Sequence, residues 1–158
     1  MTMSLYIFSD KQVNSVAEWQ AAIDREGYPL QLSADMVFER LSGFFPMHLR
    51  GELTGFECYH EDLADVQENV IPDIRLDHEW KFVLGFVWLG GREPELIAAW
   101  MAATAYSQET AGIIFDCEGE GRFLIPAQAR AVVQELEHPS PATLAAMREI
   151  RELFRRDE

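Results

Sequence analysis

KFVLGFVWL, residues 81–89, decides the fold of this chain. The stretch is apolar at nearly every position, which is typical of a strand that is covered on both faces at the centre of a sheet. Gly90-Gly91 turns the chain after it, and the apolar spacing over 94–111 predicts a long helix that ends at Gly112. Ile113-Ile114-Phe115 reads as a further strand, so the segment predicts a βαβ unit.

The residues that precede this unit predict a strand and two helices. Aromatic and β-branched residues over 5–8 indicate a first strand. Ser15-Val16-Ala17-Glu18 is a capping box, which predicts the start of a helix over 15–26. Ser33 begins a second, short helix that turns Met36, Val37 and Leu41 toward the core and ends at Gly43.

Antiparallel strands and a C-terminal pair of helices complete the expected fold. Apolar and polar residues alternate over 44–61, with glycines near the turns. A helix opens at Pro126, and a proline-containing break then leads into residues 137–158, a terminal linker and amphipathic helix. We expect residues 1–158 to form a single α+β domain. Its architecture is a two-layer sandwich, with a mixed β-sheet, helices packed on one face and a C-terminal helical pair.

Composition places the chain among globular proteins of the cytoplasm. Hydrophobic residues make up 48% and charged residues 25% of its 158 residues, which is ordinary for a packed domain. The longest apolar run is too short to span a bilayer, and the N-terminus has no signal-peptide pattern. We therefore expect a cytoplasmic protein in which Cys58 and Cys117 are reduced.

The formal net charge of −14 is unevenly distributed along the chain. Residues 122–158 are balanced, with six basic and six acidic residues, whereas residues 52–79 carry nine acidic residues against Arg75 alone. A protein with this charge repels nucleic-acid phosphates and anionic membrane surfaces, so we expect neither as a partner. Two interpretations remain open, because the acidity serves either solubility or a basic protein partner.

If a partner is bound, the acidic segment is where we expect it. The residues expected to face the partner are Glu57, Glu61, Asp62, Asp65, Glu68, Asp73, Asp77 and Glu79.

No sequence motif for catalysis, metal or cofactor binding is present. His60 and His78 each stand among acidic residues, which is the composition of a metal site or a carboxylate-held general base, but their spacing matches no such motif. Gly90-Gly91-Arg92 lies where phosphate-binding loops occur, yet it lacks their glycine spacing and lysine. We therefore predict no catalytic residue, no cofactor and no metal.

One stretch of the chain resembles a known group of proteins. Trp80-Lys81-Phe82-Val83 through Trp88, the Ala-rich helix and Thr110-Ala111-Gly112-Ile113-Ile114-Phe115-Asp116 resemble small, largely uncharacterised bacterial proteins. Some of those are immunity-like proteins of polymorphic toxin systems. The residues concerned are mostly core and turn residues, so the resemblance implies a shared fold more than a shared function.

These observations favour a non-catalytic acidic protein-binding module, of the immunity type, that neutralises a basic toxin. The alternative is a small enzyme, or a ligand- or metal-binding domain, that uses the His and carboxylate residues of 48–79. A third possibility is a structural or regulatory subunit with no ligand of its own. A deep pocket that brings His60 and His78 together would favour the alternative, and a broad acidic face would favour the binding module.

Overall fold

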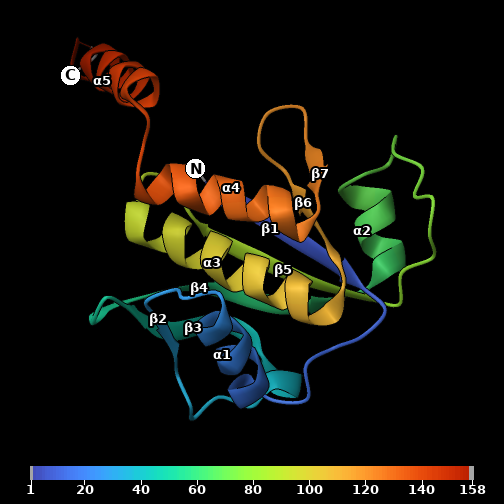
Figure 1. The fold of residues 1–158 in the computed structure, drawn as a ribbon. Helices are drawn as coiled ribbons and strands as arrows, with labels where there is room; N and C mark the ends of the chain where they lie inside the picture. Colours follow the sequence, from blue (N-terminus) through green and yellow to red (C-terminus); the bar gives the residue numbers. More distant parts are fainter. Residues whose placement is uncertain (1, 157–158) are drawn as a thin grey trace.

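The computed structural model describes residues 2–156 and shows an α+β fold (Figure 1). Seven strands form one sheet: β1 (Thr2–Ser9), β2 (Leu30–Leu32), β3 (Ser42–Leu49), β4 (Glu52–Glu61), β5 (Phe82–Leu89), β6 (Ile113–Asp116) and β7 (Arg122–Leu124). The α-helices are α1 (Val16–Arg25), α2 (Leu63–Asn69), α3 (Glu93–Thr110), α4 (Pro126–Glu137) and α5 (Pro141–Arg156). The α+β class and the C-terminal helical pair are thus confirmed.

The strands lie in the order β2-β3-β4-β5-β1-β6-β7, and each neighbouring pair is antiparallel. The expected mixed sheet is therefore corrected to an antiparallel one. The reason is that β1 lies between β5 and β6 and pairs with both, so the strand–helix–strand segment crosses over a strand instead of pairing its own two strands. Residues 81–89 still lie centrally, as the sequence predicts.

The β3–β4 hairpin closes through a two-residue turn at Arg50 and Gly51. Both residues have positive φ, 50° and 81°, and Leu49 pairs with Glu52 on either side of them. Such turns match the right-handed twist of the strands that they join. The other expected turn glycine, Gly55, lies within β4 instead.

Helices α1, α3 and α4 lie on one face of the sheet, which we call the inner face (Figure 1). Trp19 of α1 is fully buried there, and its indole Nε1 donates a hydrogen bond to the Ala102 carbonyl of α3 at 3.0 Å. Its rings lie 5.9 Å from Phe86 of β5 and 5.1 Å from Tyr106 of α3. One aromatic side chain thereby joins both helices to the central strand.

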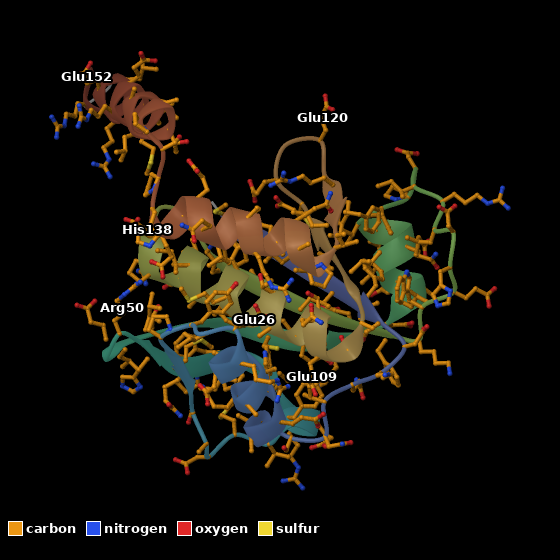
Figure 2. All side chains as sticks on the ribbon, viewed as in Figure 1. Glu26, Arg50, Glu109, Glu120, His138 and Glu152 are labelled. Carbon is orange, nitrogen blue, oxygen red and sulfur yellow. The ribbon has the colours of Figure 1, made fainter. Side chains whose placement is uncertain are left out.

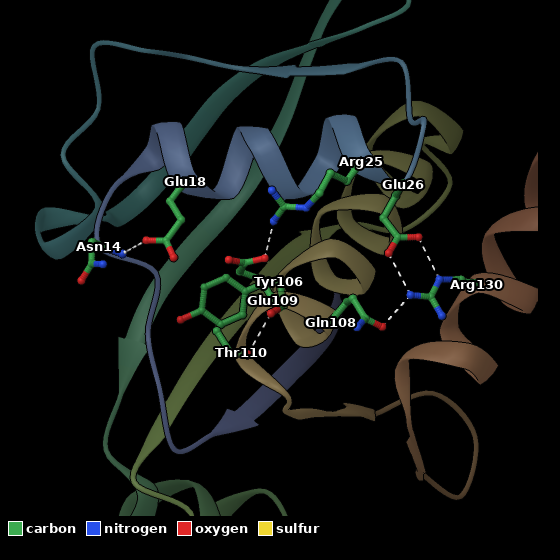
Figure 3. Close-up of polar contacts among 9 residues, drawn as sticks. All are labelled: Asn14, Glu18, Arg25, Glu26, Tyr106, Gln108, Glu109, Thr110 and Arg130. Atoms are coloured by element: carbon green, nitrogen blue, oxygen red, sulfur yellow. Dashed lines mark hydrogen bonds and ion pairs between the residues drawn. The ribbon is translucent and has the colours of Figure 1, made fainter.

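Polar contacts at the surface hold α4 beside α1 and α3 (Figure 3). Arg130 of α4 donates two hydrogen bonds to the Glu26 carboxylate, at 2.8 and 2.9 Å, and another to Gln108 of α3. Arg25 and Glu109 form a further ion pair between α1 and α3. The two parallel hydrogen bonds between Arg130 and Glu26 fix the orientation of these side chains and also bring opposite charges together.

The opposite, outer face of the sheet is covered only at one end. There Val66 of α2 and Ile71 pack on Phe8, Val83 and Phe115 in a second, smaller core. The sequence also predicts a short helix here, from the spacing of Leu63, Val66 and Val70. Its place on the outer face corrects the expectation that the helices pack on one face only.

Two local expectations are wrong. Residues 38–40 form a single 3-10 turn in place of a short helix, and Val37 is half exposed instead of buried, whereas Leu41 is buried and Met36 packs against the core as predicted. Residues 83–86 are buried, but the outer face opens toward the end of β5, where Val87 is partly buried and Leu89 is 47% exposed. Among residues 2–156, no helix is long and apolar enough to cross a membrane.

Candidate protein-binding surface

The eight acidic residues that the sequence predicts as partner-binding lie along one continuous segment of structure. Glu57 and Glu61 are on β4, and Asp62 is the N-cap of α2, where its carboxylate accepts a hydrogen bond from the amide of Ala64. Asp65 and Glu68 follow on α2; Asp73, Asp77 and Glu79 lie in the coil between α2 and β5. Seven of the eight are exposed and Glu61 is partly buried, so the segment presents negative charge to solvent.

Glu57 stands between two apolar side chains on the outer face. In the sheet register it is directly opposite Phe44 of β3 on one side and Val87 of β5 on the other. Directly opposed residues in antiparallel strands point to the same face and touch. Phe44 is 56% exposed and Val87 is partly buried, so an exposed carboxylate lies within an open apolar strip.

The hydroxyl of Tyr59 holds the Glu57 carboxylate in place. It donates a hydrogen bond to Glu57 Oε1 at 2.5 Å, and the two residues share the outer face of β4 because they are two apart. This bond to Glu57 raises the pKa of the Tyr59 phenol. The bond orients one carboxylate oxygen while the carboxylate remains exposed to a partner.

Glu61 continues the same row of side chains toward α2. A Cβ added to Gly85 would lie 3.0 Å from Glu61 Cγ and 3.3 Å from Tyr6 Cε1, so both side chains lie over this glycine of β5. Burial, and then the nearby Asp65 carboxylate, raise the pKa of Glu61. The glycine leaves room for both side chains over β5. Burial and the Asp65 carboxylate disfavour the ionised form of Glu61, and a positive partner group would stabilise it.

The coil that follows α2 forms a hollow of about 780 Å³. Its lining combines the apolar residues Leu63 and Trp80 with Asp73, His78 and Glu79. The ring of His78 lies against that of Trp80, and its Nε2 is 2.6 Å from Asp10 Oδ2. Acidic and apolar side chains therefore occur together here as well.

The two histidines of the alternative hypothesis do not converge. His60 points to the inner side, where a ring nitrogen is 2.7 Å from the Phe38 carbonyl and the rings meet edge to face. His78 lies on the outer side beside Trp80. Within residues 2–156, no group of three or more His, Cys, Asp or Glu side chains is placed to hold a metal ion.

The two cysteines are free and lie on opposite faces of the sheet. Cys58 is fully buried in the inner core, and Cys117 packs against the outer cluster. Burial raises the pKa of both thiols, that of Cys117 to about 11. Neither thiol is therefore activated as a nucleophile at neutral pH.

The loop at Gly90-Gly91-Arg92 has carboxylates where a phosphate would bind. Glu95 accepts a hydrogen bond from the Leu89 amide at 3.2 Å and pairs with Arg92, while Glu93 begins α3. Negative side chains in the first turn complement the helix dipole and repel a phosphate. The structure thus agrees with the reading of this loop as a turn.

The apolar part of the surface was not predicted from the sequence. Phe44, Leu53 and Leu89 are exposed on the outer face, although each belongs to a pattern that also fits a buried strand. Phe44 alternates with the buried Phe45 in β3, so the two side chains lie on opposite faces of the sheet. The sequence pattern does not say which of these faces the helices leave open.

Scanning the chain against protein-family models, curated proteins and solved structures gave no significant match.

Proposed function

We propose that this chain is a non-catalytic acidic protein-binding module whose outer face and α2 bind a basic protein partner. The observation that supports the proposal is the position of Glu57 between Phe44 and Val87, on a part of the sheet that α1, α3 and α4 leave open. The carboxylate row continues through Glu61 to Asp62 on α2.

This arrangement has the two parts that a protein interface needs. Apolar and aromatic side chains supply burial at the centre, whereas charges at the rim set orientation and rate of association. Phe44 and Tyr59 provide aromatic surface, and α2 provides the acidic rim. A lysine or arginine of the partner would meet Glu57 while its stem covers Phe44.

The partner class that fits is a basic toxin or nuclease. Such a protein has a positive substrate-binding surface because nucleic-acid phosphates are negative. An acidic face that occupies this surface would exclude the substrate without any chemistry of its own. In this role the chain is an immunity-type protein, like some of the bacterial proteins that the stretch from Trp80 to Asp116 resembles.

The proposal is tested by capturing the partner from a lysate of the source organism and measuring association with the purified partner. We expect the double change Glu57→Lys and Glu61→Lys to lower the on-rate at least tenfold at 50 mM salt. The difference should shrink at 1 M salt, where the Debye length falls to about 3 Å.

The matched control reverses the charge of two carboxylates that lie outside the proposed binding surface. Glu118 and Glu120 are exposed in the β6–β7 loop, and Glu120 projects from its tip (Figure 2). Glu118→Lys with Glu120→Lys changes the net charge equally, so a comparable loss of on-rate would show a general charge effect. That result, or a captured partner that is acidic, would contradict the proposal.

A second candidate follows from the hollow beside α2. Its histidine, carboxylates and Trp80 suit a small polar ligand. In a thermal-shift screen, a small polar compound that binds there would raise the melting temperature, and His78→Ala would abolish the rise. An unchanged melting temperature would leave the protein-binding function as the better account.

A further inference from the structure

Helix α5 has an apolar stripe that its own domain leaves open. Leu144, Ile150 and Leu153 are 43%, 53% and 60% exposed, respectively. Figures 1 and 2 show the helix beyond the end of α4, with the side chain of Glu152 directed away from the body. Exposed apolar side chains that recur on one helix mark a contact surface.

The first turn of α5 is tied to α4, but the rest of the helix does not pack closely. The Thr143 hydroxyl donates a hydrogen bond to the Glu135 carboxylate. Further along, Met147 lines a cavity of about 280 Å³ that separates α5 from Leu96 and Leu136. The intrachain contact therefore leaves a void and covers only part of the stripe.

The charge of α5 is opposite to that of the rest of the chain. Residues 141–156 contain four arginines and two glutamates, whereas residues 1–140 contain 23 acidic and 9 basic residues. Arg148, Arg151 and Arg155 recur at helical spacing along one edge of the apolar stripe. This edge disfavours antiparallel pairing of α5 with itself, because the arginines of two copies would meet.

A groove that is lined by both apolar and acidic side chains lies close to the start of α5. It is a hollow of about 670 Å³ between the β3–β4 hairpin and the N-terminal end of α3, and we call it the Phe44 groove. Its main lining residues are Phe44, Leu53, Gly55, Glu93, Pro94 and Glu95. The residues Gly91, Arg92 and Glu93 line both this groove and the cavity beside α5.

We propose that α5 docks in the Phe44 groove of a second copy of this chain, so that two copies exchange their C-terminal helices. Leu53 is 70% exposed and matches the apolar stripe, while Glu93 and the adjacent Glu57 match the arginine edge. Residues 138–140 span at most about 10 Å, and Met147 of α5 lies across a cavity from Leu96 of α3 and Leu136 of α4. In the proposed exchange, the groove that α5 fills is that of the other copy.

The exchange makes a closed dimer. Because each copy gives one helix and one groove, two equivalent contacts form about a two-fold axis, and no further copy is added. The docked helix would cover Phe44 and Glu57, which the proposed function assigns to a basic partner, so binding of that partner would displace α5. The inference is nevertheless tested separately, since self-association is measured on the purified protein alone.

The first test is the mass of the full-length protein by sedimentation velocity from 1 to 200 µM. We expect a concentration-dependent dimer that Ile150→Asp and Leu53→Glu each weaken at least tenfold. Ile125→Asp is the control, because Ile125 is equally exposed but lies at the start of α4. A monomer at every concentration, or a dimer that survives both changes, would overturn the proposal.

A second test separates exchange between copies from docking within one copy. Two single variants, Leu53→Cys and Ile150→Cys, are purified separately, mixed and oxidised. We expect a mixed disulfide dimer in the mixture at a yield well above that of either variant alone. A double variant that carries both Leu53→Cys and Ile150→Cys is oxidised in parallel. If these two cysteines form a disulfide within one chain, α5 reaches its own groove and the exchange is excluded.

Discussion

The ring of Phe44 lies across Gly55 on the outer face of the hairpin. A Cβ at Gly55 would stand 2.8 Å from Phe44 Cζ and 2.3 Å from the backbone oxygen of Phe45. The glycine therefore allows β3 and β4 to approach and provides the flat floor on which the aromatic ring rests. Gly55 thus supports both the hairpin and the apolar part of the proposed surface.

We expect Gly55→Ala to destabilise the protein by about 1–3 kcal/mol or more, because a backbone atom cannot move aside as a side chain can. Gly85→Ala is the comparison, since its added Cβ would meet side chains, Glu61 and Tyr6, at 3.0 Å or more. Urea denaturation of both variants measures the difference. Equal losses would mean that the approach of the strands at Gly55 is not the limiting contact.

Two valines of β5 are expected to respond differently to the same change. Val83 is buried under α2, so Val83→Asp leaves an unpaired carboxylate in an apolar site and should unfold the protein. Val87 lies on the open part of the outer face, so Val87→Asp should fold and lose partner binding. Circular dichroism separates the outcomes, and unfolding by both changes would show that the outer face is covered near Val87.

The two buried indoles at positions 19 and 88 form a matched pair. Trp19 Nε1 donates to the Ala102 carbonyl, whereas Trp88 Nε1 is buried without a hydrogen-bond partner among the described atoms. Trp19→Phe should therefore cost about 1–2 kcal/mol more than Trp88→Phe, since it also leaves a buried carbonyl with one bond fewer. Thermal unfolding of both variants measures the two losses of stability. Equal losses would mean that the smaller volume of the phenylalanine side chain, and not the hydrogen bond, is the cause.

The pKa of Glu61 predicts how stability changes with pH. Because burial raises this pKa in the folded state, the ionised Glu61 carboxylate lowers the stability of the fold at pH values above that pKa. Below the pKa of the unfolded chain, the carboxyl is protonated in both states and this loss of stability disappears. Glu61→Gln should therefore raise the melting temperature at pH 7, and the gain should vanish as the pH falls to about 4. Glu120→Gln, at the tip of the β6–β7 loop, is the control. A gain that stays constant between the two pH values would contradict the assignment.

Local patterns in the sequence determined most of the elements. The capping box at Ser15 starts α1, where the hydroxyl accepts a hydrogen bond from the amide of Glu18. The glycine at the turn of the hairpin and the proline in the first turn of α3 mark their elements in the same way. These features could be read from sequence because their physical cause lies within a few residues.

The acidic segment was also located from sequence, since charge is a property of composition. Seven of its eight predicted residues are exposed, as expected for carboxylates that lack buried partners. Whether they bind a partner stays a prediction that the association experiment tests.

Only the tertiary structure decided which face of the sheet stays open. β1, from the start of the chain, inserts between β5 and β6, and this long-range pairing makes the sheet antiparallel. The same assembly places α2 over Val83 and leaves Phe44 and Leu89 exposed. An apolar strand residue carries the same local pattern whether a helix covers it or not, so its exposure depends on elements that are distant in sequence.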